Sequence, residues 1–586
     1  MNNVFKKFTW KIGGEAGFGI KSAGLSFAKA LMRSGYETFD YVEYPSLIRG
    51  SHNTYQVTVS DKPVHSTENR IDILVALNKE TIDKHLNELT PGAAVIYDGG
   101  EIKLSPIKYR EKNIHLISVP FKKITEQTGG GEIMRNTVAM GATIALIDLP
   151  LSVLENIIKE LFSRKPDVIA SNLKAIELGY KFVKENYKAL NFKIKLEVLK
   201  KDQRLLISGN EAMGMGALAG GLNFFTAYPM TPSTTVMQYL AAHGVETGLI
   251  VKHAEDEISV INMALGAAHV GARAMCATSG GGFALMGEAV GLACVSETPL
   301  VIINVQRPGP ATGMPTWTDQ GDLRFVLHSA QGEGERIVLA PGDINECFYQ
   351  TAEALNIAEK YQLPVIVLSD KFLGEGTGTV ERFDENKVTI NRGKLLAENK
   401  IPNNYKRYKL ATDGVSARTL PGMKNGLFLA DSYEHDEYGY SSEKVKDRLE
   451  QVHKRAQKLV TAAAELNGAN LYGPANAKIT LVAWGSVKGP VLDALDLLPE
   501  KIKNNFNLLH LNVIWPFPAK QVGAILGKAG LLAKQKKIVL VENNYLGQLG
   551  LLIRQETGIE IKDRILRYDG RPFFPEELVE EFKKIK

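Results

Sequence analysis

At 586 residues, the chain is longer than the roughly 250–300 residues at which a single hydrophobic core stops growing, so several domains are expected. Its residues are 44 % hydrophobic and 23 % charged, an ordinary mixture for globular proteins, which excludes large-scale disorder. The net charge is only +5, and no Lys/Arg-rich run is interleaved with aromatic residues, so nucleic-acid binding has no support.

The first segment, residues 1–190, is predicted to be an α/β domain with a largely parallel sheet. The β-like runs FTWKIGG, IDILVAL and AAVIYD alternate with helical patterns. GGEAGFGIKSAG lies between the first run and a helix. Its glycines either offer backbone N–H groups to a phosphate or make a tight turn. The spacing of Gly17, Gly19 and Gly24 is not the dinucleotide-binding fingerprint, so both interpretations stay open.

A second α/β domain is predicted at residues 200–375, after a Lys-rich linker at 182–204. From LLISGN onward, apolar strands such as PLVIINV and LPVIVLSD alternate with helices, which indicates a parallel sheet buried on both faces. Residues 376–474 form a polar connecting region. A smaller α/β domain is predicted at 475–586, beginning with the strand ITLVAWG.

Targeting and membrane signals are weak. The start, MNNVFKKFTWKIGG, lacks the apolar core of a secretion signal. The apolar stretch 280–305 is interrupted by Glu288 and Glu297, which argues against a membrane span. We therefore expect a cytoplasmic protein with no membrane partner.

One stretch of the second domain, HAEDEISVINMALGAAHVG, places three carboxylates before a helix of small and apolar residues. Glu255, Asp256 and Glu257 could simply complement the positive end of the helix dipole. Alternatively, one of these acids contacts a flat ligand, because a Gly/Ala-rich helix allows such a ligand to approach its backbone closely.

Three neighbouring stretches favour the ligand. YPMTPST holds two prolines around Thr231, TSGGG bares its backbone, and QRPGPATGMPTWTDQGDLR is dense in Pro, Gly and Thr. Arg307 follows the strand PLVIINV, at the carboxyl end where open α/β sheets bind ligands. Its alternative role is a structural ion pair. An acid, an apolar pocket and an anion-binding arginine together make a candidate site.

These stretches resemble the 2-oxoacid:ferredoxin oxidoreductases. GGEAGFGIKSAG and EYPSLIRGSH are similar to the γ module of that family, and YPMTPST, the Glu257 helix, ATSGGG and QRPGPATGMPT to its α subunit. ENNYLGQLGLLIR and YDGRPF are similar to the C-terminal domain of the α subunit. The resemblance covers nearly the whole chain. It implies a fused γ–α subunit with a γ-type domain, a pyrimidine-binding-type domain and a transketolase C-terminal-like domain.

The resemblance also implies roles for residues. Glu257 would be the carboxylate that shares a proton with the aminopyrimidine of thiamine diphosphate. Thr231, Arg307 and Thr316 would hold the 2-oxoacid, with the Arg307 fork pairing with its carboxylate. The cofactor would contact Tyr228, Pro229, Glu257, Ser279, Gly280 and Gly281. DSYEHDEYG at 431–439 is either a metal cluster or, as we favour, a solvated turn.

A second subunit follows from what the chain lacks. Its three cysteines, Cys276, Cys294 and Cys347, include no Cys-x-x-Cys pair, which excludes a self-contained disulfide framework, zinc site or four-cysteine cluster. Gly-Asp-Gly, the family's mark of the diphosphate–metal half, does not occur. The resemblance therefore implies a β subunit that carries Mg²⁺ and a 4Fe-4S cluster, an active site at the α–β interface, and a dimer of αβ heterodimers.

The implied reaction is the decarboxylation of a 2-oxoacid, with 2-oxoglutarate first, transfer of the acyl group to coenzyme A and reduction of ferredoxin. A pyruvate, branched-chain or aryl-pyruvate enzyme is the closest alternative. A non-catalytic scaffold subunit of the same fold and a thiamine diphosphate enzyme without redox chemistry are alternatives from other classes.

Overall fold

The computed structural model describes residues 7–46, 51–129, 131–163, 165–199, 204–527 and 537–585. The chain forms two compact units. Unit 1 comprises residues 1–207, 376–382 and 574–586, and unit 2 comprises residues 208–375 and 383–573. Among the described residues, no helix is both long enough and apolar enough to span a membrane.

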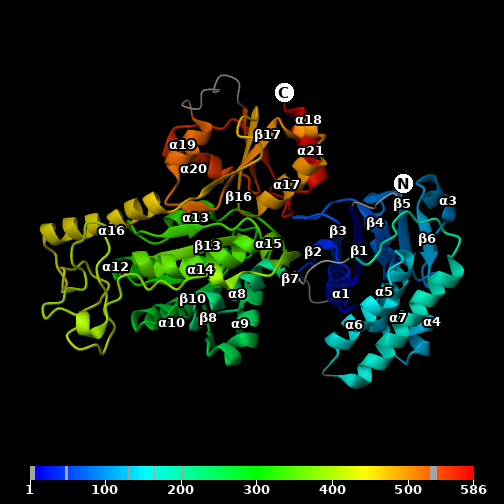
Figure 1. Cartoon of the computed structure of the whole chain (residues 1–586), viewed down its shortest axis with the longest axis horizontal. Coiled ribbons are helices and arrows are strands. Elements are labelled where there is room, and N and C mark those ends of the chain that lie inside the picture. Colours follow the sequence, from blue (N-terminus) through cyan, green and yellow to red (C-terminus); the bar gives the residue numbers. More distant parts are fainter. Residues whose placement is uncertain are drawn as a thin grey trace. The chain divides into compact units, whose positions relative to one another are not determined.

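Within the described residues, unit 1 is built on an eight-stranded sheet in the order β6-β5-β4-β1-β3-β2-β14-β7 (Figure 1). The predicted largely parallel sheet is in fact mixed. Strands β1, β4, β5 and β6 are parallel, whereas β1, β3, β2 and β14 pair antiparallel. The strands are β1 Lys7–Glu15, β2 Glu37–Glu43, β3 His52–Ser60, β4 Ile71–Ala76, β5 Leu89–Tyr97, β6 His115–Ser118, β7 Arg204–Ser208 and β14 Thr377–Glu381.

Distant segments complete unit 1. LLISGN, predicted to open the second domain, provides the edge strand β7 of this sheet instead. Residues 377–381 return from the second domain as β14, and the helix α21 begins at Pro575. Glu576 Oε1 accepts hydrogen bonds from the backbone N–H groups of Asn69 and Arg70 at 3.0 and 3.2 Å.

Helices surround this sheet. They are α1 Ile20–Arg33, α2 Lys79–His85, α3 Pro106–Glu111, α4 Phe121–Gln127, α5 Arg135–Leu146, α6 Leu151–Leu161, α7 Pro166–Asn186 and α21 Pro575–Lys584. Gly17 and Gly19, between β1 and α1, have φ angles of 96° and 68°, a left-handed backbone that favours glycine. Gly24 packs on Tyr55, where a Cβ atom would lie 2.0 Å from the ring. These three glycines thus suit a tight turn and close packing.

The first sheet of unit 2 has seven strands in the described residues, in the order β18-β12-β13-β11-β10-β8-β9. All of its pairs are parallel except that of β18, which comes from the C-terminal part of the chain. Every residue of β11 and β13 is buried, as predicted for a sheet covered on both faces. The strands are β8 Phe224–Ala227, β9 Ile250–His253, β10 Ala274–Thr278, β11 Leu300–Gln306, β12 Ile337–Leu339, β13 Pro364–Asp370 and β18 Val513–Trp515.

The helices of this layer connect the parallel strands, as βαβ topology requires. They are α8 Gly209–Ala219, α9 Thr234–Thr247, α10 Glu257–His269, α11 Gly280–Leu285, α12 Gly287–Val295, α13 Leu323–His328, α14 Ile344–Tyr361 and α15 Lys371–Glu375.

A second, five-stranded sheet in the described part of unit 2 has the order β15-β17-β16-β19-β20. Its elements are β15 Ala469–Tyr472, β16 Ile479–Trp484, α17 Lys488–Leu497, α18 Glu500–Lys503, β17 Phe506–Leu511, α19 Ala519–Leu526, β19 Lys537–Glu542, α20 Gln548–Thr557 and β20 Asp563–Leu566. Between the two sheets in sequence, the connecting region has little regular structure before α16, Val445–Glu465. The prediction of a multidomain α/β fold with parallel sheets is confirmed.

Candidate active site

Glu257 occupies the first position of α10, and it is not the residue that caps this helix. Asp256 is the cap, since its Oδ1 accepts a hydrogen bond from Ser259 N at 2.7 Å. The Glu257 side chain is 4 % exposed, and its Oε1 is buried without a hydrogen-bond partner among the described residues. A buried carboxylate oxygen that lacks a partner is costly. Asp256 therefore caps the helix, whereas Glu257 Oε1, in the first turn, receives no hydrogen bond from the described residues.

The TSGGG loop lies directly against this carboxylate. A Cβ atom on Gly282 would lie 2.1 Å from Thr278 Oγ1 and 2.6 Å from Glu257 Oε1. Only glycine leaves room for the acid here. Thr278 Oγ1 also lies 3.9 Å from Met230 Sδ, so the loop containing YPMTPST reaches the same place.

Arg307 joins the YPMTPST loop to the end of β11. Its Nη1 donates a hydrogen bond to the backbone oxygen of Thr231 at 2.7 Å, and its Nε is buried without a partner among the described residues. Burial lowers the pKa of Arg307, and the nearby charge of Asp322 opposes this shift. In the part of the chain that the structure describes, Arg307 shares no ion pair with a carboxylate. The free N–H group makes it suited to bind an anion.

Two acidic residues in the stretch that follows Arg307, Asp319 and Asp322, were not predicted from the sequence. Asp322 lies against the TSGGG loop, because a Cβ atom on Gly280 would be 2.3 Å from its Oδ2, and it accepts a hydrogen bond from Asn304 at 3.3 Å. Burial raises the pKa of Asp322 to about 6. Burial and the charge of Asp322 raise the pKa of Asp319 to about 7. Such groups exchange protons near neutral pH and are typical of functional sites. In the sequence, only the acidic residues of TDQGD, within QRPGPATGMPTWTDQGDLR, could have indicated these two groups.

Residues of the C-terminal part of unit 2 accept hydrogen bonds from the loop that follows Arg307. Thr318 N donates to Gly570 O at 3.1 Å, and Gln320 N donates to Asn543 O at 2.8 Å. The guanidinium of Arg571 lies 3.3 Å from the centroid of the Trp317 ring. ENNYLGQLG and YDGRPF therefore shape the site from outside it.

The other predicted residues lie on the same loops. Ser279 and Thr316 are buried, with hydroxyl oxygens that lack partners among the described residues. Tyr228, Pro229 and Gly281 are exposed. A Cβ atom on Gly281 would lie 3.8 Å from Ala311 O, so the Pro- and Gly-rich loop after β11 approaches the TSGGG loop.

DSYEHDEYG lies outside this site and is built as a hydrogen-bonded turn. Glu434 pairs with Arg448 and Arg455, and both ring nitrogens of His435 lie next to backbone oxygens. Asp436 Oδ1 accepts from two backbone N–H groups. Among the residues with described positions, no group of three or more His, Cys, Asp or Glu could hold a metal ion.

Comparisons with known proteins identify the relatives of this chain. Residues 9–182 match the family "Pyruvate ferredoxin/flavodoxin oxidoreductase", and residues 215–454 match "Pyruvate flavodoxin/ferredoxin oxidoreductase, thiamine diP-bdg". The 2-oxoacid:ferredoxin oxidoreductase subunit alpha of Saccharolobus solfataricus is 33 % identical over 99 % of this chain and 98 % of its own length. The 2-oxoglutarate oxidoreductase subunit KorA of Mycobacterium tuberculosis is 28 % identical over 99 % of this chain and 91 % of its own length.

One solved structure is similar over the whole length. It is a 2-oxoglutarate:ferredoxin oxidoreductase from Magnetococcus marinus with 2-oxoglutarate, coenzyme A and succinyl-CoA bound. Its chain is 33 % identical, each chain covers 99 % of the other, and the TM-score is 0.91.

Proposed function

The chain belongs to the family of 2-oxoacid:ferredoxin oxidoreductase α subunits, and on this premise we propose that it is the fused γ–α subunit of an enzyme that converts a 2-oxoacid and coenzyme A to acyl-CoA and CO₂ while reducing ferredoxin. The observation that carries the proposal is the buried, unpartnered Glu257 carboxylate at the glycine of the TSGGG loop. The match to a thiamine diphosphate-binding family over residues 215–454 supports the cofactor.

The residues present fit thiamine diphosphate. When bound, it supplies the nucleophilic carbon and the electron sink that decarboxylation requires. Glu257 Oε1 is free to hold a proton against a ring nitrogen, and its burial excludes the water that would otherwise compete for that proton. Ser279, Gly280 and Gly281 bring backbone rather than bulky side chains to the same place, which leaves space for a flat ring.

The 2-oxoacid carboxylate is assigned to Arg307. With Nη1 fixed on Thr231 O, the guanidinium is oriented before the substrate arrives, and its free Nε can donate to a carboxylate oxygen. The hydroxyls of Thr231 and Thr316 complete the substrate contacts that we propose.

We propose 2-oxoglutarate as the preferred substrate, with pyruvate, branched-chain or aryl-pyruvate acids as the alternative. Support comes from the solved relative that holds 2-oxoglutarate and succinyl-CoA. The test is to compare kcat/KM for 2-oxoglutarate, pyruvate and 2-oxoisovalerate, with coenzyme A and ferredoxin present. A higher kcat/KM for pyruvate or 2-oxoisovalerate would reassign the substrate.

A partner β subunit is proposed to carry the Mg²⁺–diphosphate half and the 4Fe-4S cluster. All three cysteines of this chain are buried, and burial raises the pKa of Cys276 and Cys294 to about 12, so neither is a ready thiolate ligand. We propose further that two αβ heterodimers assemble in the cytoplasm.

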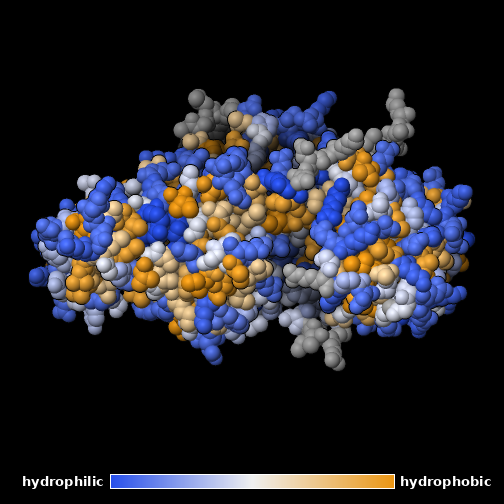
Figure 2. Space-filling model, turned by 60° about the horizontal axis from the view of Figure 1, so that its bottom comes forward, coloured by the Kyte–Doolittle hydropathy of each residue, from blue (hydrophilic) through white to orange (hydrophobic). Residues whose placement is uncertain are grey.

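The surface beside the site suits such a partner. On α10, which begins at Glu257, the apolar residues Ile258 and Met263 are exposed, at 53 % and 38 %, and so is Val270 at the other end of the helix, at 61 %. Figure 2, which turns the side of α9 and α10 towards the viewer, shows hydrophobic surface there. Large exposed apolar patches mark sites of association. An interface on this helix would enclose Glu257.

Expressed without a partner, this chain is expected to bind neither iron nor thiamine diphosphate with useful affinity, because half of the site is proposed to lie on the β subunit. Metal analysis and cofactor titration of the isolated chain test this. Co-purification from the source cells should yield a cysteine-rich subunit of roughly half the mass of this chain. Iron bound stoichiometrically by the isolated chain would contradict the proposal.

Gly282→Ala is expected to lower the rate of decarboxylation by about 10²-fold, since an ångström of displacement at a reacting group can cost that much. The added methyl group would meet Glu257 Oε1 at 2.6 Å and push the carboxylate aside. Gly287→Ala is the matched control, because its new Cβ would have no neighbour closer than 3.7 Å. Equal activities of the two variants would show that the contact with Gly282 does not position the acid.

The rival functions predict different behaviour. A scaffold subunit does not require a buried carboxylate that lacks a hydrogen-bond partner among the described residues. A decarboxylase without redox chemistry would release an aldehyde and would not reduce ferredoxin. Ferredoxin reduction that depends on coenzyme A distinguishes the proposed reaction from both.

A further inference from the structure

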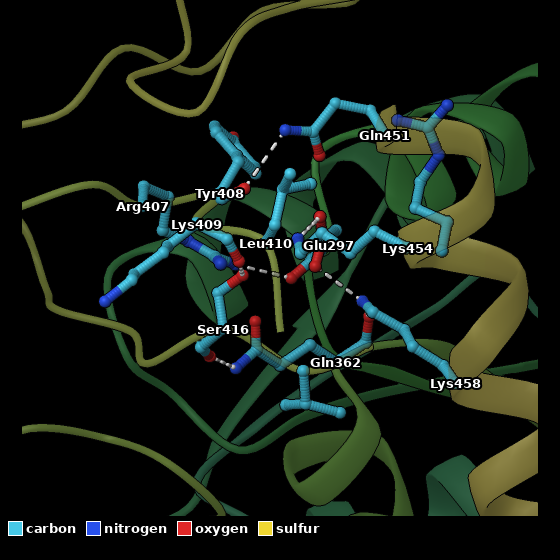
Figure 3. Close-up of polar contacts among 12 residues, drawn as sticks. Glu297, Gln362, Arg407, Tyr408, Lys409, Leu410, Ser416, Gln451, Lys454 and Lys458 are labelled. Atoms are coloured by element: carbon cyan, nitrogen blue, oxygen red, sulfur yellow. Dashed lines mark hydrogen bonds and ion pairs between the residues drawn. The ribbon is translucent and has the colours of Figure 1, made fainter. Parts of the chain in front are cut away.

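A buried ion cluster lies in unit 2, centred on Glu297 at the end of α12. Lys454 and Lys458 reach its carboxylate from α16, and Arg407 of the connecting region donates to its backbone oxygen at 2.8 Å (Figure 3). The Glu297–Lys458 pair is 2.7 Å long. The side chains of both lysines and of Glu297 are at most 1 % exposed. Two lysine side chains thus meet the Glu297 carboxylate, and Arg407 meets its backbone oxygen, all away from water.

A small cavity adjoins this cluster. The centre of a water-sized sphere can move within about 10 Å³ of it, which leaves room for one water molecule or one monatomic ion. Its lining is mainly polar and consists of His269, Ser296, Glu297, Thr298, Pro299, Arg407, Arg418, Thr419 and Phe428.

The free donors of this lining belong to its two arginines. Arg407 and Arg418 are each 3 % exposed, and Arg407 Nη1 and Arg418 Nε are buried without partners among the described residues. The hydroxyl of Ser296 already donates to Leu292 O at 2.6 Å, and that of Thr419 donates to Gly426 O at 2.8 Å. Each of the two arginines that line this cavity therefore keeps an unpaired guanidinium N–H group.

The surrounding charges leave the cavity positive. Arg418 and Arg392 share the carboxylate of Glu359, and both lysines are engaged with Glu297. Burial lowers the pKa of Lys454 to about 7 and also lowers that of Lys458. Even without the lysine charges, the three arginines Arg392, Arg407 and Arg418 outnumber the two carboxylates. Burial and the two cavity arginines lower the pKa of His269, so this ring is neutral at neutral pH. The Glu335 carboxyl acts electrostatically on Lys458, but burial raises the pKa of Glu335, which disfavours its charged form. Buried charge without a counter-charge is strongly destabilising.

We propose that this cavity binds a single-atom anion, chloride, between Arg407 and Arg418. The anion offsets the excess positive charge and accepts the two unpaired N–H groups. It also joins the connecting region to the end of α12, because Arg407, Arg418 and Thr419 come from the former and Ser296 and Glu297 adjoin the latter. A polyatomic anion such as gluconate is too large for a space that holds one small species.

Bromide tests the site directly, because it replaces chloride and scatters anomalously. Crystals of the protein, in the assembly in which it purifies, are grown or soaked in bromide and measured at the bromine absorption edge. We expect an anomalous peak in the cavity, near Arg407 Nη1 and Arg418 Nε. A cavity without a peak at high bromide concentration would overturn the proposal, because it would then hold water only.

Thermal stability tests the role of the anion. Replacing sodium gluconate by sodium chloride at constant ionic strength should raise Tm by about 1–3 °C, because a ligand that binds only the folded state stabilises it. Constant ionic strength removes general screening. Equal Tm values in the two salts would overturn the proposed stabilisation.

Paired variants tie the effect to the cavity. Arg418→Gln removes a cavity donor and should abolish the chloride-dependent shift. Arg392→Gln is the control, because Arg392 binds the same Glu359 but does not line the cavity, so its chloride response should remain. A chloride response retained in Arg418→Gln would contradict the assignment. Should Arg418→Gln fail to fold, the bromide peak in the unaltered protein decides.

Discussion

Glu257→Gln is expected to reduce decarboxylation by the assembled enzyme by about 10²–10⁴-fold, the usual worth of a general acid–base group. The amide keeps the size of the side chain and its place against Gly282, but it cannot take up and return a proton. Since Oε1 has no partner among the described residues, the substitution breaks no hydrogen bond between that oxygen and these residues. Folding should therefore be unchanged. The measurement is the initial rate of ferredoxin reduction with 2-oxoglutarate and coenzyme A.

The control is Glu255→Gln, two residues earlier. Glu255 is exposed, whereas Glu257 is 4 % exposed, so Glu255→Gln should leave the rate within a few-fold of the parent. Thiamine diphosphate content should be measured for both variants, because a loss of cofactor would mimic a loss of catalysis. Equal losses for the two variants, or a larger loss for Glu255→Gln, would remove Glu257 from the proposed role.

Residues of the site that belong to motifs could be predicted from the sequence. Glu257, Arg307 and the TSGGG loop follow or precede parallel strands, and the carboxyl ends of such strands meet at one edge of a sheet. Gly282 was not singled out, although it is the glycine in contact with the acid. The three consecutive glycines look alike in sequence, and only packing distinguishes the one that faces Glu257.

Pairings between distant segments could not be predicted. β7 and β14 join the sheet of unit 1 because its edge offers unpaired backbone groups, a property of the folded sheet that no local pattern records. β18 likewise extends the parallel sheet of unit 2 in the antiparallel sense. Asp319 and Asp322 were missed for a related reason, since their raised pKa values come from burial by elements far away in sequence.

In the connecting region, too, contacts with distant segments could not be predicted from the sequence. Its composition predicted a polar connecting region, yet Arg407, Lys454 and Lys458 are almost fully buried. Charged residues are rarely buried unless paired, so composition counts them as surface residues. Their partner, Glu297, lies more than a hundred residues earlier, which hides the pairing from any reading of the local sequence.

Arg307→Lys separates a substrate ligand from a structural arginine. A charge-assisted bond between the guanidinium and a carboxylate in a desolvated site is worth roughly 1.5–3 kcal/mol, which corresponds to about a 10–150-fold loss of kcat/KM. Lysine keeps the charge and can still donate to Thr231 O, but it lacks the planar fork and the free Nε. The loss should therefore affect every 2-oxoacid, while Tm, subunit stoichiometry and thiamine diphosphate content stay near those of the parent.

Arg324→Lys is the matched control for this variant. Arg324 lies in the same stretch, is exposed, and contacts Gln548 only through its backbone N–H group, so kcat/KM should not change. A structural arginine at position 307 would behave differently, because its loss would lower Tm or loosen the complex and activity would fall with the folded fraction. Kinetics for two 2-oxoacids, measured alongside Tm, separate the two cases. Unchanged kinetics, or a loss fully explained by instability, would exclude Arg307 from substrate binding.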